Sequence, residues 1–269
     1  MTKNIYLTVI TLITIGCIIG GMLYHTGGLP GMRPDKSITR KTETIFQEDG
    51  EVTAIVLDSE VMDVRFRTGE NLEIAYGGNE KLKPEISLQD GTLTITQRGK
   101  VRSRFNLFGF GKNGARLDVT IPSGTKLENF TSQIDACDME IAQLAIADVK
   151  IHGNIGDIKV AGTAFDRTDI SLNTGDLEVE DASLGTGTIG MNTGDTDVKN
   201  CTFEELLVTG DVGDIDVVLA GDRSTYAINL STDMGEVEIF DRDEGRSFSQ
   251  EGSGPSLTVE NNVGDIEVK

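Results

Sequence analysis

Residues 173–179 read Asn-Thr-Gly-Asp-Leu-Glu-Val, and 19 residues later residues 192–198 read Asn-Thr-Gly-Asp-Thr-Asp-Val. The phrase is Asn or Asp, any residue, Gly, an acid, then apolar–any–apolar. Its copies begin at residues 135, 154, 173, 192, 211, 233 and 262, with Cys137 in the Gly position of the first. A fixed period of this size indicates stacked coils, each of which buries its apolar side against its neighbours.

The copies, read in register, give three apolar columns. The first holds alternating pairs such as Ile158 and Val160, and the others hold positions such as Phe165 and Ile170. Period-two alternation with β-branched residues is typical of strands with one face inward. The sequence therefore predicts an all-β fold, in which residues 125–269 form a β-solenoid of about seven coils with a 19-residue repeat. Side chains in the Asn column, at 154, 173 and 192, are expected to bond from coil to coil.

Residues 42–124 are predicted to be further β-structure without the strict period, with a hairpin turn at Asp90-Gly91. Because the first coil of a solenoid must be covered, we expect this region to be a separate N-terminal β cap. Residues 241–255 lengthen one coil. Inserted loops in solenoids often line a binding face, but we expect this one to be a flexible, uninvolved loop. Cys137 and Cys201 lie about three coils apart, which predicts free thiols.

The first 41 residues predict a membrane attachment. Asn4–Tyr24 is uncharged and long enough to span a bilayer, so residues 1–25 are expected to be an uncleaved transmembrane helix and residues 26–41 a Gly/Pro linker. Bases at 33, 36, 40 and 41 favour a cytoplasmic position for the C-terminal side of this helix. The short N-terminal tail and the long C-terminal domain favour export. We expect a single-pass protein of the bacterial cell membrane with an extracytoplasmic repeat domain.

The charge is uneven along the chain, whose formal net charge is −20. Residues 117–269 hold 31 acids and 9 bases, whereas residues 1–116 are close to neutral. An acidic rod repels phosphates, so nucleic acid is not an expected partner.

Two outward acidic columns are expected from the strand phrase, because its apolar pair points inward. The columns are Asp157, Asp176, Asp195, Asp214, Glu236, Asp265 and Lys159, Glu178, Asp197, Asp216, Glu238, Glu267. This face could hold Ca²⁺ weakly or bind a cationic peptide. The weak calcium candidates are Asp176, Asp195, Asp197, Asp214 and Asp216. Alternatively, the acids only keep the rod soluble and discourage edge pairing.

A second candidate site is the acid-free stretch from Arg98 to Arg116, where bases alternate with aromatic residues. The candidate contact residues are Arg102, Arg104, Phe105, Phe108, Phe110 and Lys112. Such a composition suits an anionic membrane surface or an acidic partner, including the acidic rod of the same chain. The alternative is a long hairpin loop whose Phe side chains fold back onto the cap.

The order of these segments resembles a bacterial family. The segments are Asp90–Ile95, then Leu117–Gly124, then serial Gly-Asp-apolar strands, and together they are similar to the β-strand-repeat "putative adhesins" that include LiaG-like membrane proteins of envelope-stress operons. The resemblance spans roughly residues 40–269. It implies an exported or membrane-attached β-solenoid associated with envelope stress or surface contact, and it implies no catalytic residues.

Catalysis has little support in the sequence. Only two His residues and no Trp are present, and no nucleophile, phosphate or dinucleotide motif occurs. We expect a non-enzymatic, adhesin-like interaction module without cofactors, whose partner is an envelope component, a cationic peptide or a membrane protein. One alternative is a carbohydrate-active enzyme that uses paired carboxylates among Asp195, Asp197, Asp214 and Asp216. A calcium-stabilised scaffold is the other.

Overall fold

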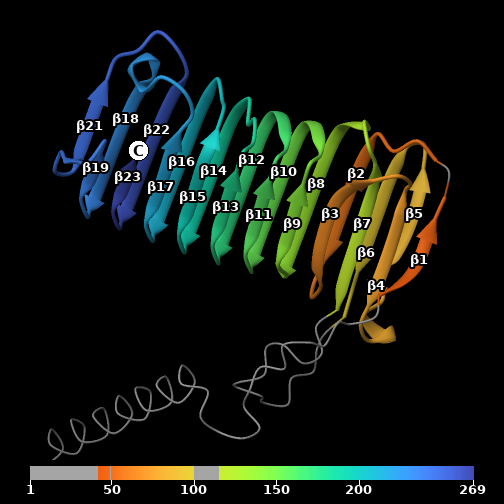
Figure 1. The fold of residues 1–269 in the computed structure, drawn as a ribbon. Coiled ribbons are helices and arrows are strands. Elements are labelled where there is room, and N and C mark those ends of the chain that lie inside the picture. Colours follow the sequence, from red (N-terminus) through yellow and green to blue (C-terminus); the bar gives the residue numbers. More distant parts are fainter. Residues whose placement is uncertain (1–41, 49, 100–114) are drawn as a thin grey trace, which may run out of the picture. The chain divides into compact units, whose positions relative to one another are not determined.

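The computed structural model describes residues 42–48, 50–99 and 115–269 (Figure 1). The predicted membrane segment and linker, and the candidate residues between 102 and 112, lie outside these ranges. Residues 41–269 form one compact unit. Within the described residues, two large sheets account for every strand, and two short 3₁₀ helices, Glu80–Leu82 and Arg223–Thr225, lie in connections.

The sheets are called A and B here, and their strands are given in spatial order. Sheet A contains β1 (Glu43–Gln47), β4 (Glu73–Gly77), β7 (Arg116–Pro122), β3 (Asp63–Gly69), β9 (Met139–Ala142), β11 (Ile158–Ala161), β13 (Leu177–Glu180), β15 (Thr196–Cys201), β17 (Ile215–Leu219), β23 (Ile266–Val268), β19 (Val237–Ile239) and β20 (Arg242–Asp243). Sheet B contains β5 (Glu85–Gln89), β6 (Thr92–Gln97), β2 (Ala54–Ser59), β8 (Lys126–Ala136), β10 (Ala145–Ile155), β12 (Ala164–Thr174), β14 (Thr186–Thr193), β16 (Glu205–Val212), β22 (Ser256–Val263), β18 (Ala227–Met234) and β21 (Ser247–Gln250).

Each coil contributes one strand to each sheet, and the repeat sets the register. In neighbouring coils, Ile151 lies opposite Ile170 in sheet B, and Ile158 lies opposite Leu177 in sheet A. These residues, with Phe165 from the predicted middle column, are buried between the sheets. The predicted β-solenoid and its apolar columns are confirmed. Burial of each such side chain contributes about 1.5–3 kcal/mol to the stability of the fold. A single coil could not gain this stability alone, because its apolar side chains are covered by the neighbouring coils.

The seven coils predicted for residues 125–269 are confirmed, because seven parallel strands from that range stack in each sheet, but the separate N-terminal cap needs correction. Over all the described ranges, nine parallel strands stack in each sheet, because β2/β3 and β6/β7 pair in parallel with the repeat coils. Residues 42–124 therefore extend the stack itself. The covering role falls to shorter antiparallel strands, β1 and β4 in sheet A and β5 in sheet B. The predicted hairpin is present between β5 and β6, with Asp90 and Gly91 both at positive φ.

The last two coils do not follow chain order. The C-terminal strands β22 and β23, drawn in the darkest blue, lie between β16/β17 and β18/β19 (Figure 1). Residues 241–255, expected to be an uninvolved loop, instead form β20 and β21, which pair antiparallel with β19 and β18. Because β20 and β21 cover the outer edges of β19 and β18, no further coil can pair there. The final copy of the phrase, with β22 and β23, therefore lies on the inner side of β18 and β19. The edges are thus closed by short strands that limit further pairing.

The Gly of the phrase is fixed by a close approach at the turn from sheet B to sheet A. Gly194 has φ +133°, and a Cβ there would lie 1.8 Å from the carbonyl oxygen of Gly175 one coil away. No other residue fits that position without moving the backbone. Cys137 and Cys201 are buried free thiols, as predicted. Burial raises the pKa of the Cys201 thiol to about 11.

Candidate contact face on sheet A

The outward side chains at the centre of sheet A form one row across the stack, called the charged row here. Strand pairing places one member opposite the next from β7 to β19. In spatial order the row is Asp118, Arg65, Glu140, Lys159, Glu178, Asp197, Asp216, Glu267 and Glu238. Three members, Asp118, Arg65 and Glu140, were not among the predicted site residues.

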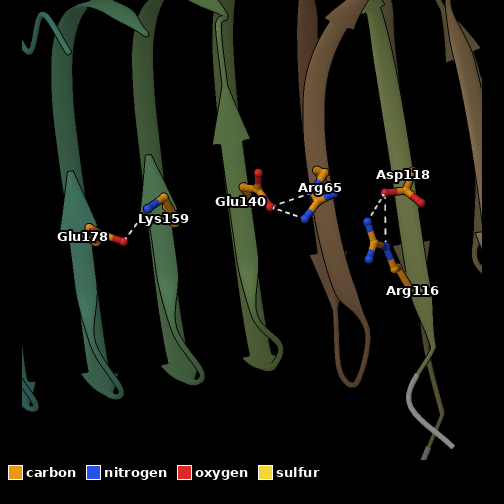
Figure 2. Close-up of polar contacts among 6 residues, drawn as sticks. All are labelled: Arg65, Arg116, Asp118, Glu140, Lys159 and Glu178. Carbon is orange, nitrogen blue, oxygen red and sulfur yellow. Dashed lines mark hydrogen bonds and ion pairs between the residues drawn. The ribbon is translucent and has the colours of Figure 1, made fainter. Parts of the chain in front are cut away.

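One half of the charged row is neutralised by ion pairs between and within strands. Arg65 contacts Glu140 at 2.5 Å, and Lys159 contacts Glu178 at 2.6 Å on adjacent strands. Arg116 binds Asp118 at 2.8 Å on the same strand. Figure 2 shows these pairs side by side along the face. The pairing with Glu178 raises the pKa of Lys159 and lowers that of Glu178. Exposed pairs of this kind contribute little to stability, but they leave this half without excess charge.

The other half of the charged row has only acids. Asp197 pairs with Lys199 on the same strand at 3.1 Å. Glu267 pairs with Lys269, the last residue of the sequence, at 2.7 Å. Asp216 lies between them and has no hydrogen bond or ion pair within the described residues. Partial burial, together with Glu267 and Asp197, raises the pKa of Asp216. This half therefore carries uncompensated negative charge.

The acids of the turns have a different role from those of the charged row. The Asp195 carboxylate accepts the backbone N–H of Asp214 at 2.9 Å, and Asp176 accepts that of Asp195 at 3.1 Å. The same bond runs along the whole turn column, whose members are Asp138, Asp157, Asp176, Asp195, Asp214, Asp265 and Glu236. Each carboxylate except that of Glu236, the last member, thus satisfies an N–H that the tight turn leaves without a backbone partner.

The Asn column is confirmed in the same turns. Asn173 Nδ2 donates to Asn154 Oδ1 at 3.1 Å, and Asn192 Nδ2 donates to Asn173 Oδ1 at 2.7 Å. Two ladders of side-chain bonds therefore run along this edge of the stack, one of amides and one of carboxylates.

The five calcium candidates are divided between these two sets. Asp176, Asp195 and Asp214 belong to the turn column and accept backbone N–H groups, whereas Asp197 and Asp216 belong to the charged row. No group of three or more His, Cys, Asp or Glu in the described ranges is arranged to hold a metal ion. The structure does not assemble these five side chains as a calcium site.

The same division bears on the carbohydrate-active alternative, which uses Asp195, Asp197, Asp214 and Asp216. Two of the four are bonded to backbone in the turns, and Asp197 is paired with Lys199. Asp216 remains on an open strand face. The arrangement does not isolate a pair of carboxylates around one substrate position, as glycoside hydrolysis requires.

A shallow groove of about 600 Å³ lies over the neutralised half of sheet A. It is bordered by the bases Arg65, Arg116 and Lys159 and by acids of both sets, and it extends as far as Asp195 and Asp197 on β15. Glu140 could have been found from the period, because it lies 19 residues before Lys159 in the copy that begins at residue 135. Arg65 and Asp118 lie in segments that alternate charged and apolar residues as the repeat strands do, but without the 19-residue period nothing indicated that they continue the same row.

The fold and this face define an all-β solenoid scaffold with a continuous charged row on the outer face of sheet A. The chain belongs to the Toastrack DUF4097 family, which matches residues 52–269.

A solved structure of a "putative adhesin" from Bacteroides fragilis is similar in fold. It is 14% identical, with a TM-score of 0.54 over 86% of this chain and 98% of that one. A "putative cell adhesion protein" from Clostridium sporogenes is also 14% identical, with a TM-score of 0.39 over 85% and 97%. No curated protein matches the chain. Among the described residues, no helix has the length and apolar character needed to cross a membrane.

Proposed function

We propose that this protein is a non-enzymatic, adhesin-like contact module of the bacterial cell envelope. In this proposal the half of the charged row that has only acids, from Asp197 to Glu238, binds a cationic partner segment. The observation that carries the proposal is the change along one continuous row, from acids that alternate with the bases Arg65 and Lys159 to four acids in succession, of which only Asp197 and Glu267 have an ion pair among the described residues. A row of like charges is unfavourable for folding, so its concentration in one half favours a role in binding.

The remaining parts of the proposal come from the sequence. Residues 4–24 would attach the solenoid to the cell membrane as a single span, with the repeat domain outside the cytoplasm. The LiaG-like resemblance supports a link to envelope stress, and the family's "putative adhesin" relatives support contact rather than chemistry. A scaffold of this kind needs no cofactor.

The test measures binding of a fluorescent octalysine peptide to the full-length chain in neutral detergent. The triple variant Asp197→Asn, Asp216→Asn, Glu267→Gln removes charge from the acidic half without changing side-chain size. We expect affinity to fall about ten-fold or more, with most of the wild-type salt dependence lost.

The matched control removes equal charge from the outer face of sheet B, with Asp169→Asn, Glu205→Gln and Glu260→Gln. These residues lie on β12, β16 and β22. If both triple variants weaken binding equally, the affinity reflects only net charge, and the proposed site is wrong.

A further inference from the structure

Three exposed apolar side chains line the turn edge of the last three coils in space. Val212, Val263 and Met234 are 49%, 39% and 63% exposed. All three occupy the position before Gly in the repeat phrase, and pairing places Val263 directly between the other two. The central coils have Thr174 and Thr193 at this position. Ile155, also exposed, lies apart from the three, with Thr174 and Thr193 in between.

Acids flank this apolar strip on both sides. The strip lies between two polar columns. The residues just before the three side chains are 211, 233 and 262, and the residues two positions after them, beyond the Gly, are all acids. The acids of the two columns, all exposed, are Asp211, Asp233, Asp214, Asp265 and Glu236. No base occurs in the three phrases. This surface, called the acidic–apolar edge here, consists of Val212, Val263, Met234 and these five acids.

The composition of the acidic–apolar edge specifies what would cover it. A contiguous apolar strip on a soluble surface marks a contact site, and the surrounding acids require bases around the apolar groups of the partner. The chain itself has one such segment. Residues 100–114 contain Lys100, Arg102, Arg104 and Lys112 around three Phe residues and Leu107, with no acid. The flanking Arg98 and Arg116 are already paired, with Asp58 and Asp118.

The segment is attached at the opposite end of the stack. Gly99 N–H donates to Glu60 Oε2 at 2.9 Å, and Asp63 N–H donates to Ala115 O at 3.0 Å, so both ends are held at one turn. Residues 100–114 connect β6 to β7 and thus replace the Gly-Asp turn of the outermost coil. Gly99 and Ala115, the described residues on either side of the segment, lie at the same edge as Val212, Val263 and Met234.

A segment tethered at both ends cannot cover the acidic–apolar edge of its own chain. Half of its length, fully extended, reaches about 28 Å. The coils of Val212, Val263 and Met234 are five, six and seven strands from β3 in sheet A, or about 24, 29 and 34 Å at 4.8 Å per strand. If the segment extended as far as the coil of Val263, none of its residues would remain to contact the edge.

We propose that the acidic–apolar edge binds residues 100–114 of a second copy of this chain. Donor and acceptor lie at opposite ends of the stack but on the same edge, so two antiparallel copies whose turn edges face each other make the contact twice, in a two-fold dimer. This goes beyond the proposed function, because it uses the turn edge rather than the charged row and a different partner.

The first test titrates a labelled peptide of residues 99–115 into the full-length chain in neutral detergent. The double variant Met234→Ser, Val263→Ser should weaken binding about ten-fold, because two apolar contacts are lost from exposed positions. Ile155→Ser is the control, since it removes an equally exposed side chain from a distant coil. Binding that the double variant leaves unchanged, or that the control weakens as much as the double variant does, would overturn the proposal.

The second test measures the mass of the full-length chain against concentration by sedimentation. Wild type should form a dimer. The double variant Arg102→Glu, Arg104→Glu should remain monomeric, and so should the double variant Met234→Ser, Val263→Ser. A mixture of the two variants should recover a weaker dimer, because one variant keeps the acidic–apolar edge and the other keeps the basic segment, so one of the two contacts can still form. If wild type and both variants have the same mass distribution, or if the mixture remains monomeric, the second copy is not the occupant, even where the peptide binds. Octalysine has no apolar residues, so its binding should be unaffected by the double variant Met234→Ser, Val263→Ser. The test of the acidic–apolar edge is therefore distinct from the test of the charged row.

Discussion

The turn column and the charged row differ in how their carboxylates are used, although their members are only two residues apart in each coil. In the turn column, the Asp195 carboxylate accepts a hydrogen bond from the backbone N–H of Asp214 in the next coil. In the charged row, Asp216 faces outward between two further acids, with no such donor. The comparison teaches that a repeated acid can be a structural element or a free charge, and that only the position in the turn decides which.

The largest effect is expected from breaking the turn itself. Gly194→Ala introduces a Cβ 1.8 Å from the Gly175 carbonyl oxygen at a positive φ, so the backbone has to move. We expect a loss of roughly 3 kcal/mol or more in the free energy of unfolding, measured by urea titration. Gly190→Ala in the same coil is the control. Its Cβ would lie 3.5 Å from Thr209 Oγ1, and the change should stay within about 0.5 kcal/mol.

Removing one carboxylate of the turn column should have a smaller effect. Asp195→Ala leaves the N–H of Asp214 without its acceptor and should cost about 1 kcal/mol. Asp195→Asn keeps an oxygen in the same place, so its free energy of unfolding should remain near the wild-type value. Equal destabilisation by Ala and Asn would mean that the bond does not stabilise the turn.

Removing the Asp216 charge from the charged row should increase the free energy of unfolding, whereas removing an acid from the turn column lowers it. The pKa of Asp216 is raised in the folded state, so its ionisation opposes folding, and stability falls as pH rises from the ordinary carboxyl pKa through the raised one. Asp216→Asn should therefore stabilise the protein at pH 7, by about 0.2–1 kcal/mol. The gain should vanish below the ordinary pKa, where Asp216 is protonated in both states. Denaturation at several pH values, with Asp197→Asn for comparison, checks the sign.

Calcium should have the smallest effect of all. Because three of the five candidate ligands accept backbone N–H groups, millimolar Ca²⁺ should raise the melting temperature no more than NaCl of equal ionic strength does. A calcium-specific rise that Asp197→Asn abolishes would show that the charged row, and not the turn column, holds the ion.

The sequence predicted the interior of the stack well. Positions such as Ile158 and Val160 alternate with polar residues, and burial of apolar groups with period two leaves few alternatives. The Asn bonds and the hairpin at Asp90-Gly91 were also predictable, because they depend on neighbours at fixed spacing.

The ends of the stack and the division of the acids were not predictable in the same way. The phrases at 233–239 and 262–268 are interchangeable as strands, and only the covering strands β20 and β21 determine which is outermost. Likewise, Asp195 and Asp197 both point outward in the pattern. Which one bonds to backbone depends on the turn geometry set by Gly194, and the alternation alone does not contain that information.

Amide hydrogen exchange at Asp214 tests the distinction between the two sets of acids most directly. If the turn carboxylate holds this N–H, the amide is protected in the wild type and in Asp216→Asn, and it loses that protection in Asp195→Ala. Equal exchange rates for Asp214 in Asp195→Ala and in the wild type would contradict the structural role of the turn column, and with it the separation from the charged row.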